Sequence, residues 1–197
     1  MEYIFATTNE GKIREIREIF QKRGLYVRAL HEIGRNFPEP EETGETLLDN
    51  AMIKARYYAE TIDSGLNAVF AEDSGIFIDA LPDILGVHSA RFLGGDTPRG
   101  KQNQAILEMM KDVPDEKRTA RFICAAVCVL PDGSVMTAEG AVEGIIAREP
   151  RGKNGFGYDP IFFIPEYGRT AAEITDFEKD RVSHRGAAFR ALLDKII

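Results

Sequence analysis

Apolar residues follow two alternating patterns along the chain. Short apolar runs, typical of buried strands, are separated by stretches in which apolar residues recur every three or four positions, as on one face of a helix. The first pair is a strand over residues 3–6 and a helix with Ile13, Ile16, Ile19 and Phe20 on one face. This alternation predicts an α/β fold.

The same patterns assign elements to the rest of the chain. Further strands are predicted at 67–71, 121–130, 135–147 and 160–164, and further helices at 45–62, 103–110 and 186–196. Pro131-Asp132-Gly133 is a turn signal between the two long strands. Ser183 is placed to cap the last helix. Because no repeat or linker interrupts the pattern, residues 1–197 are predicted to form a single domain.

Composition favours a folded, cytoplasmic protein. Hydrophobic residues make up 44% of the 197 residues and charged residues 29%, which is the balance of a soluble globular protein. The longest apolar run, at 122–130, is too short to cross a bilayer. The N-terminus shows no signal-peptide pattern. We therefore expect a cytoplasmic location and no membrane partner.

The charge balance disfavours a nucleic-acid partner. The chain has 25 basic and 32 acidic residues and a net charge of −7, whereas non-specific nucleic-acid binding needs a broad basic face. A small cationic pocket remains compatible with this balance. Cys124 and Cys128 lie inside the apolar run and are interpreted as buried thiols. The three histidines are scattered and do not have the spacing of a zinc site.

The loop from Ala6 to Lys12 is the first candidate for chemistry. A loop that leads into a helix presents backbone N–H groups and the positive end of the helix dipole, which suits phosphate. Lys12 adds a charge, and residues 7–9 add polar side chains. The loop is not a Walker A motif, because Ala6 replaces the first glycine and Ile13 replaces the metal-binding hydroxyl. An ordinary turn with a solvated lysine is the alternative, and on this segment alone it is favoured.

Two acidic segments are candidates for metal binding. Glu72-Asp73-Ser74-Gly75 follows a predicted strand, and ligands of open α/β sheets bind beyond the carboxyl ends of strands. Asp73 there suits a magnesium ligand or a proton acceptor. Residues 41–45 precede a helix on which Asn50 and Lys54 share one face. The alternatives are a hydrogen-bonded turn for the first segment and acidic residues that complement the helix dipole for the second.

A glycine-rich segment, Gly155-Phe156-Gly157-Tyr158-Asp159-Pro160, suits the binding of a flat base. Phe156 would stack on the base and Asp159 would accept hydrogen bonds from its edge. A turn with a core phenylalanine is the alternative. Lys179, His184 and Arg185 add a small cationic group. Taken together, phosphate donors, carboxylates, a stacking ring and cations indicate a nucleoside triphosphate as the ligand.

Six motifs occur in a distinctive order. They are Ala6-Thr7-Thr8-Asn9-Glu10-Gly11-Lys12, Glu42-Thr43-Gly44 with Asn50-Ala51 and Lys54-Ala55, Glu72-Asp73-Ser74-Gly75, Ser89-Ala90-Arg91, Gly155-Phe156-Gly157-Tyr158-Asp159-Pro160, and Ser183-His184-Arg185-Gly186. In this order they resemble the motifs of the inosine triphosphate pyrophosphatase family, whose bacterial members are XTP/dITP diphosphatases. The resemblance spans residues 3–193. Thr8 departs from the usual glycine, and Glu72 from a common second aspartate.

The resemblance implies a fold, a reaction and partners. The implied fold is an elongated two-lobed α/β architecture around a long mixed β-sheet flanked by helices, with the active cleft between the lobes. The implied reaction is the Mg2+-dependent hydrolysis of non-standard purine nucleoside triphosphates (ITP, dITP and XTP) to the monophosphate and pyrophosphate. This reaction removes deaminated purines from the nucleotide pool. A homodimer is implied as well.

The resemblance also implies roles for individual residues. Asp73 is the expected proton acceptor and a magnesium ligand, and Glu42 is expected to assist with the metal. With Lys54 added from the helix pattern, the expected substrate-binding residues are Thr7, Thr8, Asn9, Glu10, Gly11, Lys12, Lys54, Ser74, Phe156, Gly157, Tyr158, Asp159, Lys179, His184 and Arg185. We expect Asp73, linked to magnesium, to deprotonate a water that attacks the α-phosphorus, while magnesium, Lys12 and Lys54 neutralise the leaving pyrophosphate.

Choice of the base is expected to depend on donors to the 6-oxo group. His184 and Arg185 are the candidates for this readout, since buried donors left unpaired by adenine are costly. Two other functions remain open: a pyrophosphatase for other modified nucleotides, and a nucleotide-binding sensor without turnover. Glu42 and Asp73 argue against the sensor, because paired carboxylates are unfavourable in a phosphate pocket unless a metal bridges them.

Overall fold

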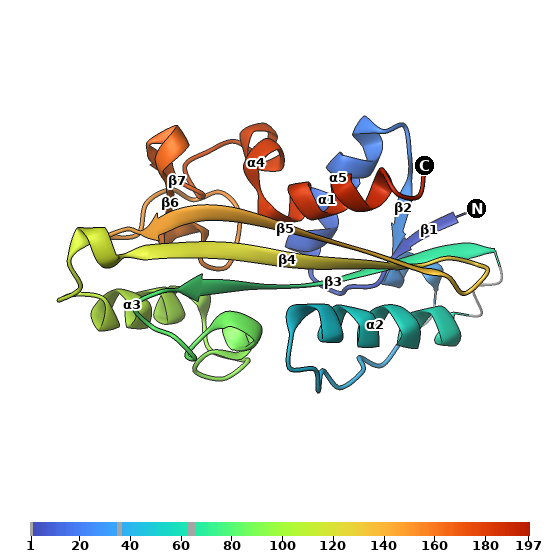
Figure 1. Cartoon of the computed structure of the whole chain (residues 1–197), viewed down its shortest axis with the longest axis horizontal. Coiled ribbons are helices and arrows are strands. Elements are labelled where there is room, and N and C mark those ends of the chain that lie inside the picture. The colour runs from blue at the N-terminus through green and yellow to red at the C-terminus, as the bar shows by residue number, and fades with distance from the viewer. Residues whose placement is uncertain (1, 35–36, 63–65) are drawn as a thin grey trace. The chain divides into compact units, whose positions relative to one another are not determined.

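The computed structural model describes residues 2–34, 37–62 and 66–197, which form a mixed α/β architecture (Figure 1). Seven strands within these residues form one sheet in the order β2-β1-β3-β4-β5-β6-β7. They are β1 (Glu2–Phe5), β2 (Val27–Ala29), β3 (Asn67–Ile78), β4 (Thr119–Val129), β5 (Val135–Ile146), β6 (Phe162–Ile164) and β7 (Arg169–Thr170). Strand β1 is parallel to β2 and β3, whereas β6 is antiparallel to β5 and β7. The predicted mixed sheet is confirmed.

Helices connect the strands. The α-helices are α1 (Glu10–Lys22), α2 (Leu47–Thr61), α3 (Arg99–Met109), α4 (Asp176–Val182) and α5 (His184–Leu193). Short 3₁₀ helices lie at Leu30–Ile33, Gly86–Arg91, Asp115–Lys117, Asp159–Ile161 and Pro165–Tyr167. The chain divides into two compact units. The first comprises Met1–Asp73, Cys124–Gly140 and Ser183–Ile197, and the second comprises Ser74–Ile123 and Ala141–Val182.

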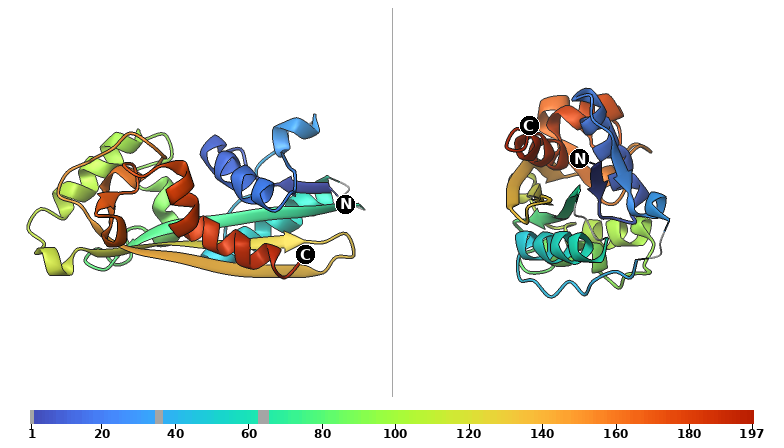
Figure 2. Two further views of the ribbon diagram at one scale, coloured as in Figure 1. Left: turned by 90° about the horizontal axis from the view of Figure 1, so that it is seen from above. Right: turned by 90° about the vertical axis from the view of Figure 1, so that its right-hand side faces the viewer.

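The first unit has a hydrophobic core on each face of its strands. In β1, Phe5 joins a cluster with Phe20 of α1 and Phe189 of α5, whereas Ile4 joins a cluster with Tyr58 of α2. Helices α1 and α5 accordingly lie side by side on one face, and α2 covers the other (Figures 1 and 2). Each such buried side chain stabilises the fold by about 1.5–3 kcal/mol. The apolar faces predicted for the helices α1 and α2 are confirmed.

The second unit is built around a third hydrophobic cluster. Ile76 of β3, Ile106 of α3 and Phe162 of β6 are fully buried within it. Within this unit, α3 lies on the lower side of the strands and α4 on the upper side in the view of Figure 1. Helix α3 begins at Arg99, four residues before the predicted start at 103. Its first turn carries no apolar residue that the periodicity could detect.

The predicted end of the strand at 67–71 is wrong. Strand β3 continues without interruption to Ile78, so Glu72-Asp73-Ser74-Gly75 lies within the strand and not in a turn beyond its carboxyl end. These polar residues are tolerated there because Glu72 and Asp73 are buried against cations of neighbouring elements. Gly75 fits because a Cβ atom at this position would lie 2.1 Å from the Gly86 carbonyl oxygen.

Most other predicted elements are confirmed. The hairpin between β4 and β5 closes with Leu130 N donating to Ser134 O at 2.9 Å, and Gly133 takes a positive φ of 83°. Ser183 caps α5, because its hydroxyl accepts a hydrogen bond from Gly186 N. The strand predicted at 160–164 begins only at Phe162, after a 3₁₀ turn. Within the described part of the chain, every helix falls short of the length and apolar character that a bilayer crossing requires.

Candidate functional site

The loop between β1 and α1 forms the predicted helix N-terminus. Asn9 caps α1, with its Oδ1 accepting a hydrogen bond from Lys12 N at 3.1 Å. Thr7 Oγ1 accepts from Asn9 N at 3.2 Å, and the Thr8 hydroxyl donates to Glu39 Oε1 at 2.6 Å. Thr8 is not among the described residues with positive φ. A glycine is therefore not required at this position, and Glu10 and Gly11 follow in the first helical turn.

Glu72 is the most enclosed carboxylate of the first unit, with a side chain only 1% exposed. Lys12 Nζ lies 2.5 Å from its Oε1, and Arg185 Nη2 lies 3.5 Å from the same oxygen. The Cys124 thiol donates to its Oε2 at 3.1 Å. Burial alone would raise the pKa of Glu72, but Arg185 and Lys12 hold it well below its usual range. Glu72 is therefore a buried anionic anchor for groups from α1, α5 and β4.

Arg185 is a second buried charge in the same cluster. Its side chain is 2% exposed, and its Nη1 also lies 2.5 Å from Glu15 Oε2. Burial would lower the pKa of Arg185, but Glu72 and Glu15 raise it. His184, which precedes Arg185 in the sequence and is the first residue of α5, is also buried. The structure therefore holds Arg185 between two carboxylates of the protein.

Asp73 makes different contacts, because successive residues of a strand point to opposite faces. Lys54 Nζ of α2 lies 3.4 Å from Asp73 Oδ1 and 2.7 Å from Glu42 Oε1. Asn50 Nδ2 lies 3.4 Å from Asp73 Oδ2, and Asn50 Oδ1 accepts from Gly44 N at 2.8 Å. A Cβ atom on Gly44 would lie 2.7 Å from that oxygen. The predicted shared face of Asn50 and Lys54 is thus confirmed.

The neighbouring carboxylates Glu72 and Asp73 also differ in the direction of their pKa shifts. Burial raises the pKa of Asp73, and the nearby Lys54 only partly opposes this effect. Burial alone would lower the pKa of Lys54, but Asp73 and Glu42 outweigh it and the pKa is raised. A buried carboxylate with a raised pKa is suited to accept a proton. Asp73 therefore has the properties of a base, whereas Glu72 has those of a fixed counter-ion.

A metal ion would find carboxylate oxygens at Asp73 and Glu42. Both side chains contact the same ammonium group of Lys54, so both lie at one place in the first unit. In the ranges 2–34, 37–62 and 66–197, no three histidine, cysteine, aspartate or glutamate side chains gather closely enough to hold a metal by themselves. This donor set resembles magnesium sites that use one or two carboxylates and complete the shell with substrate phosphates and water.

In the second unit, the segment Gly155–Asp159, called the base loop below, is held by its own side chains. Asp159 Oδ2 accepts from Phe156 N and from Lys179 Nζ, both at 2.7 Å. Lys179 Nζ also lies 5.0 Å from the centre of the Phe156 ring. A Cβ atom on Gly155 would lie 2.1 Å from Asp159 Oδ2. The structure therefore brings together the ring, the carboxylate and the cation that the sequence predicted here.

Tyr158 and Ser74 complete the predicted residues of this unit. The Tyr158 hydroxyl donates to Ser89 O at 2.6 Å, and burial raises the pKa of Tyr158. Ser74 lies half-buried within β3. Gly157 has a φ of 66°, a conformation that favours glycine, and its carbonyl accepts from Asn103 Nδ2 at 3.2 Å.

Three residues make polar contacts with the residues described above, but the sequence analysis assigned them no functional role. Ser89 belongs to a motif of the resembling family, and that motif was its only signal. Cys124 was interpreted only as a buried thiol, although it donates to Glu72. Asn103 lay in a predicted helix without any motif. Their partners are distant in the sequence, so local patterns could not identify these contacts.

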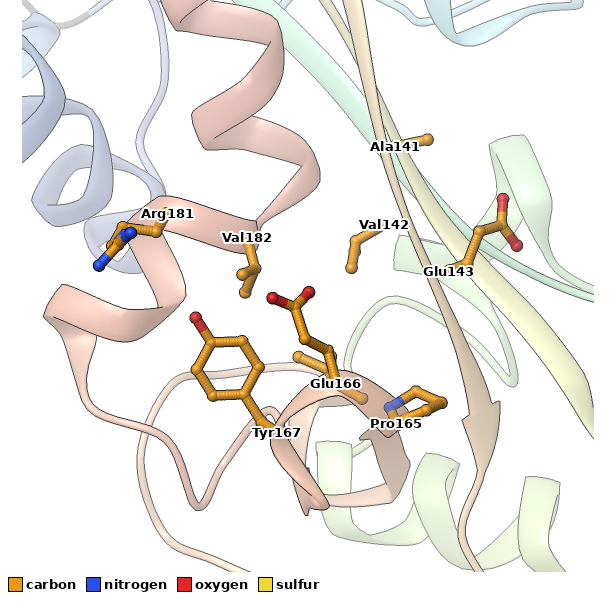
Figure 3. Close-up of a pocket in the computed structure, with 9 residues that line it drawn as sticks. Ala141, Val142, Glu143, Pro165, Glu166, Tyr167, Arg181 and Val182 are labelled. Atoms are coloured by element: carbon orange, nitrogen blue, oxygen red, sulfur yellow. The ribbon is translucent and has the colours of Figure 1, made fainter.

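A cavity of about 600 Å³ lies elsewhere in the second unit (Figure 3). Residues 141–143 of β5, 164–167 and 181–182 line it, and Figure 3 shows Glu166 and Tyr167 facing Val182 across it. The lining includes no predicted site residue. Its carboxylates, Glu143 and Glu166, are unfavourable neighbours for phosphate. The cavity is therefore not the predicted triphosphate site.

The chain is similar to known proteins over nearly its whole length. Residues 3–195 match the model of the Ham1 family. The dITP/XTP pyrophosphatase of Escherichia coli (strain K12) is 44% identical over 195 residues, covering 98% of this chain and 96% of that protein. The dITP/XTP pyrophosphatase of Bacillus subtilis (strain 168) is 44% identical over 191 residues, covering 97% and 94%.

A solved structure shows the same likeness. The HAM1 protein from Coxiella burnetii is 38% identical and superposes with a TM-score of 0.85, covering 100% of this chain and 98% of that one. The family resemblance drawn from the six motifs is therefore confirmed. The chain belongs to the Ham1 family.

Proposed function

We propose that this protein hydrolyses non-standard purine nucleoside triphosphates, such as ITP, dITP and XTP, to the monophosphate and pyrophosphate. The observation that carries this proposal is the placement of Asp73, a buried carboxylate with a raised pKa that shares the Lys54 ammonium with Glu42. The names of the relatives in Escherichia coli and Bacillus subtilis support the substrate class, because both are dITP/XTP pyrophosphatases that match nearly end to end.

The first unit binds the triphosphate in this proposal. The N-terminus of α1 offers backbone N–H groups and a positive dipole to phosphate oxygens, and Thr7, Thr8 and Asn9 lie on the loop before it. Lys12 adds an ammonium group that is already fixed by Glu72. A fixed cation stabilises developing negative charge without first having to reorganise.

Asp73 acts as the general base. It orients a water molecule, takes its proton, and directs the oxygen to the α-phosphorus, so that pyrophosphate leaves. Asp73 and Glu42 would hold magnesium together with the phosphates, as hard oxygen donors do. When bound, the ion neutralises charge on the phosphates and lowers the barrier to their displacement. Lys54 contacts both carboxylates and holds them close together when the phosphates arrive.

The base loop of the second unit binds the purine. Phe156 stacks on the ring without regard to its identity, while Asp159 and Lys179 offer an acceptor and a donor to its edge. His184 and Arg185 are proposed to read the 6-oxo group. Adenine presents an amino group where inosine and xanthine present an oxygen, so it leaves a buried donor unpaired and is rejected.

The experiment is steady-state hydrolysis of ITP, dITP, XTP, GTP and ATP with magnesium and with a chelator, with the products separated by chromatography. Monophosphate and pyrophosphate from the 6-oxo substrates, with little product from ATP and none after chelation, is the expected result. Preferred turnover of a modified pyrimidine triphosphate would support a pyrophosphatase of different specificity. Binding without turnover would leave the sensor as the better account.

We further propose that the chain acts as one domain and as a cytoplasmic homodimer. The chain passes between the two units at residues 73/74, 123/124, 140/141 and 182/183, so neither unit is a continuous segment. This supports a single functional domain over 1–197. Light scattering on the purified chain tests the dimer, and a mass of one protomer would contradict it.

A further inference from the structure

Two buried residues outside the predicted site, Asn103 and Ser89, form hydrogen bonds to the base loop. Asn103, on α3, is 4% exposed, and its Nδ2 donates to the carbonyl oxygen of Gly157 at 3.2 Å. Gly157 has a positive φ, a conformation that favours glycine, and the hydrogen bond from Asn103 holds its carbonyl. The asparagine therefore fixes the loop directly after Phe156.

Ser89 provides the second attachment. Its carbonyl accepts the Tyr158 hydroxyl at 2.6 Å. Its own hydroxyl accepts from Ile76 N at 3.0 Å and donates to Gly86 O at 2.6 Å. Ser89, whose carbonyl accepts the Tyr158 hydroxyl, is therefore hydrogen-bonded to β3 at Ile76, two residues after Ser74. Ser89 itself is 4% exposed, so water does not compete for these bonds.

The contacts within the base loop do not provide this attachment. Asp159 accepts from Phe156 N and Lys179 Nζ, which gives the loop its internal shape. Those bonds would persist if the loop moved as a body together with α4. The contacts to Asn103 and Ser89 join the loop to α3, to β3 and to the Gly86–Arg91 turn. Arg99 of α3 is a further hydrogen-bond partner of Tyr158.

We propose that Asn103 and Ser89 are positioning residues that set the purine preference of the enzyme by fixing the base loop. The proposal rests on the proposed function. Hydrogen-bond readout of a base requires placement to within about 0.5 Å, whereas stacking on Phe156 tolerates small shifts. Loosening the loop therefore weakens discrimination between 6-oxopurines and adenine more than it weakens chemistry at the phosphates.

The test compares Asn103→Ala with Gln102→Ala. Gln102 serves for this comparison because it is also a buried amide of α3 whose Nε2 donates to a backbone carbonyl, that of Phe92 at 2.5 Å. Its Oε1 accepts from Arg99 Nη1 at 2.5 Å, so these hydrogen bonds run to Phe92 and Arg99 and not directly to the base loop. For Asn103→Ala we expect the ratio of kcat/KM for ITP over ATP to fall about tenfold, the change that follows from losing one hydrogen bond of ordinary strength. KM for ITP should rise while its kcat changes less than about threefold.

Gln102→Ala should melt at a lower temperature than wild type but keep the wild-type ratio and KM. If both variants shift the ratio equally, or if Asn103→Ala leaves it unchanged, the positioning role is overturned. A wild-type protein that does not hydrolyse ITP would instead overturn the proposed function, so the two failures are distinguishable.

A second pair of variants covers the case in which Asn103→Ala does not fold. Tyr158→Phe keeps the aromatic ring and removes only the hydroxyl that binds Ser89 O. Tyr167→Phe removes the hydroxyl of a half-buried tyrosine in the same unit, which lines the cavity of Figure 3, and is the control. A lower ITP-to-ATP ratio in Tyr158→Phe alone is the expected result, and equal ratios in the two variants would overturn the proposal.

Discussion

The carboxylate cluster on β3 and the base loop are held by opposite means. Around Glu72 and Asp73, Lys12, Lys54 and Arg185 form ion pairs at 2.5–3.5 Å in a largely buried setting. The base loop, by contrast, is joined to its surroundings through backbone carbonyls that accept from Asn103 and Tyr158. Charge therefore organises the carboxylate cluster, which holds the residues proposed for the phosphates and also Arg185. Inside the base loop Lys179 pairs with Asp159, but neutral hydrogen bonds from Asn103 and Tyr158 join the loop to α3 and to the Gly86–Arg91 turn.

This difference predicts different consequences of mutation. A buried ion loses its stabilising partner when that partner is removed, and the penalty is large. A neutral hydrogen bond contributes only about 1 kcal/mol, but its direction fixes geometry. Substitutions of Glu72 or Asp73 on β3 should therefore affect the hydrolysis of all substrates or the stability of the fold. Substitutions of Asn103 or Ser89, which hold the base loop, should affect the preference between purines.

The largest effect is expected for Asp73→Asn. The amide cannot accept a proton from water, so kcat for ITP should fall about 10³-fold, within the range that general-base catalysis contributes. GTP and XTP should lose activity by the same factor, because the base does not contact the purine. Steady-state kinetics on the three substrates measures this. A loss confined to one purine would break the division between the two regions.

The next effect is on stability. Glu72→Gln leaves the buried Arg185 and the half-buried Lys12 without their shared counter-ion, and we expect the free energy of unfolding to fall by about 3 kcal/mol. Glu15→Gln is the matched control, because Glu15 also pairs with Arg185 but is 20% exposed, and it should lower the free energy by less than about 1 kcal/mol. Urea unfolding of both variants measures the difference. Equal losses would show that Glu72 is not the anchor of the cluster.

A smaller effect sharpens the role of Cys124. Cys124→Ala and Cys128→Ala both remove a buried thiol from β4, and both side chains belong to the same hydrophobic cluster. Only Cys124 donates to Glu72, so its variant should be less stable by about 1 kcal/mol than the other. Thermal melting of the two proteins is the measurement. If Cys128→Ala proves as destabilising, packing alone accounts for both cysteines.

The smallest effect is expected for Thr8→Gly, which restores the residue usual in the family. The Thr8 backbone is not in the positive-φ region, so glycine relieves no strain there. It adds entropy to the unfolded chain and removes the surface bond to Glu39, which should lower the free energy of unfolding by about 0.5–1 kcal/mol. A stabilised variant would indicate hidden strain in the loop.

Sequence periodicity predicted most of the fold because burial repeats along each element. The amphipathic faces of α1 and α2 and the hairpin turn at Gly133 were all readable in this way. The strand end predicted at Ala71 was wrong because local preference disfavours polar residues in a buried strand, while tertiary ion pairs stabilise them inside β3. Local propensity contains no information about Lys12 or Arg185.

The candidate site was predictable to the extent that its residues form motifs. Asp73 with Lys54, and Phe156 with Asp159 and Lys179, were expected and are close together. The ion pair between Arg185 and Glu15, which lie 170 positions apart in the sequence, was not predictable. The same holds for Asn103, because a polar residue inside a helix shows its partner only after the chain has folded.

The most direct test of the central claim is the hydrolysis of ITP in water enriched in oxygen-18, followed by mass spectrometry of both products. Because Asp73 directs water to the α-phosphorus in this account, the label should appear in the monophosphate, and the pyrophosphate should remain unlabelled. Label in the pyrophosphate, or orthophosphate released in place of pyrophosphate, would contradict the account.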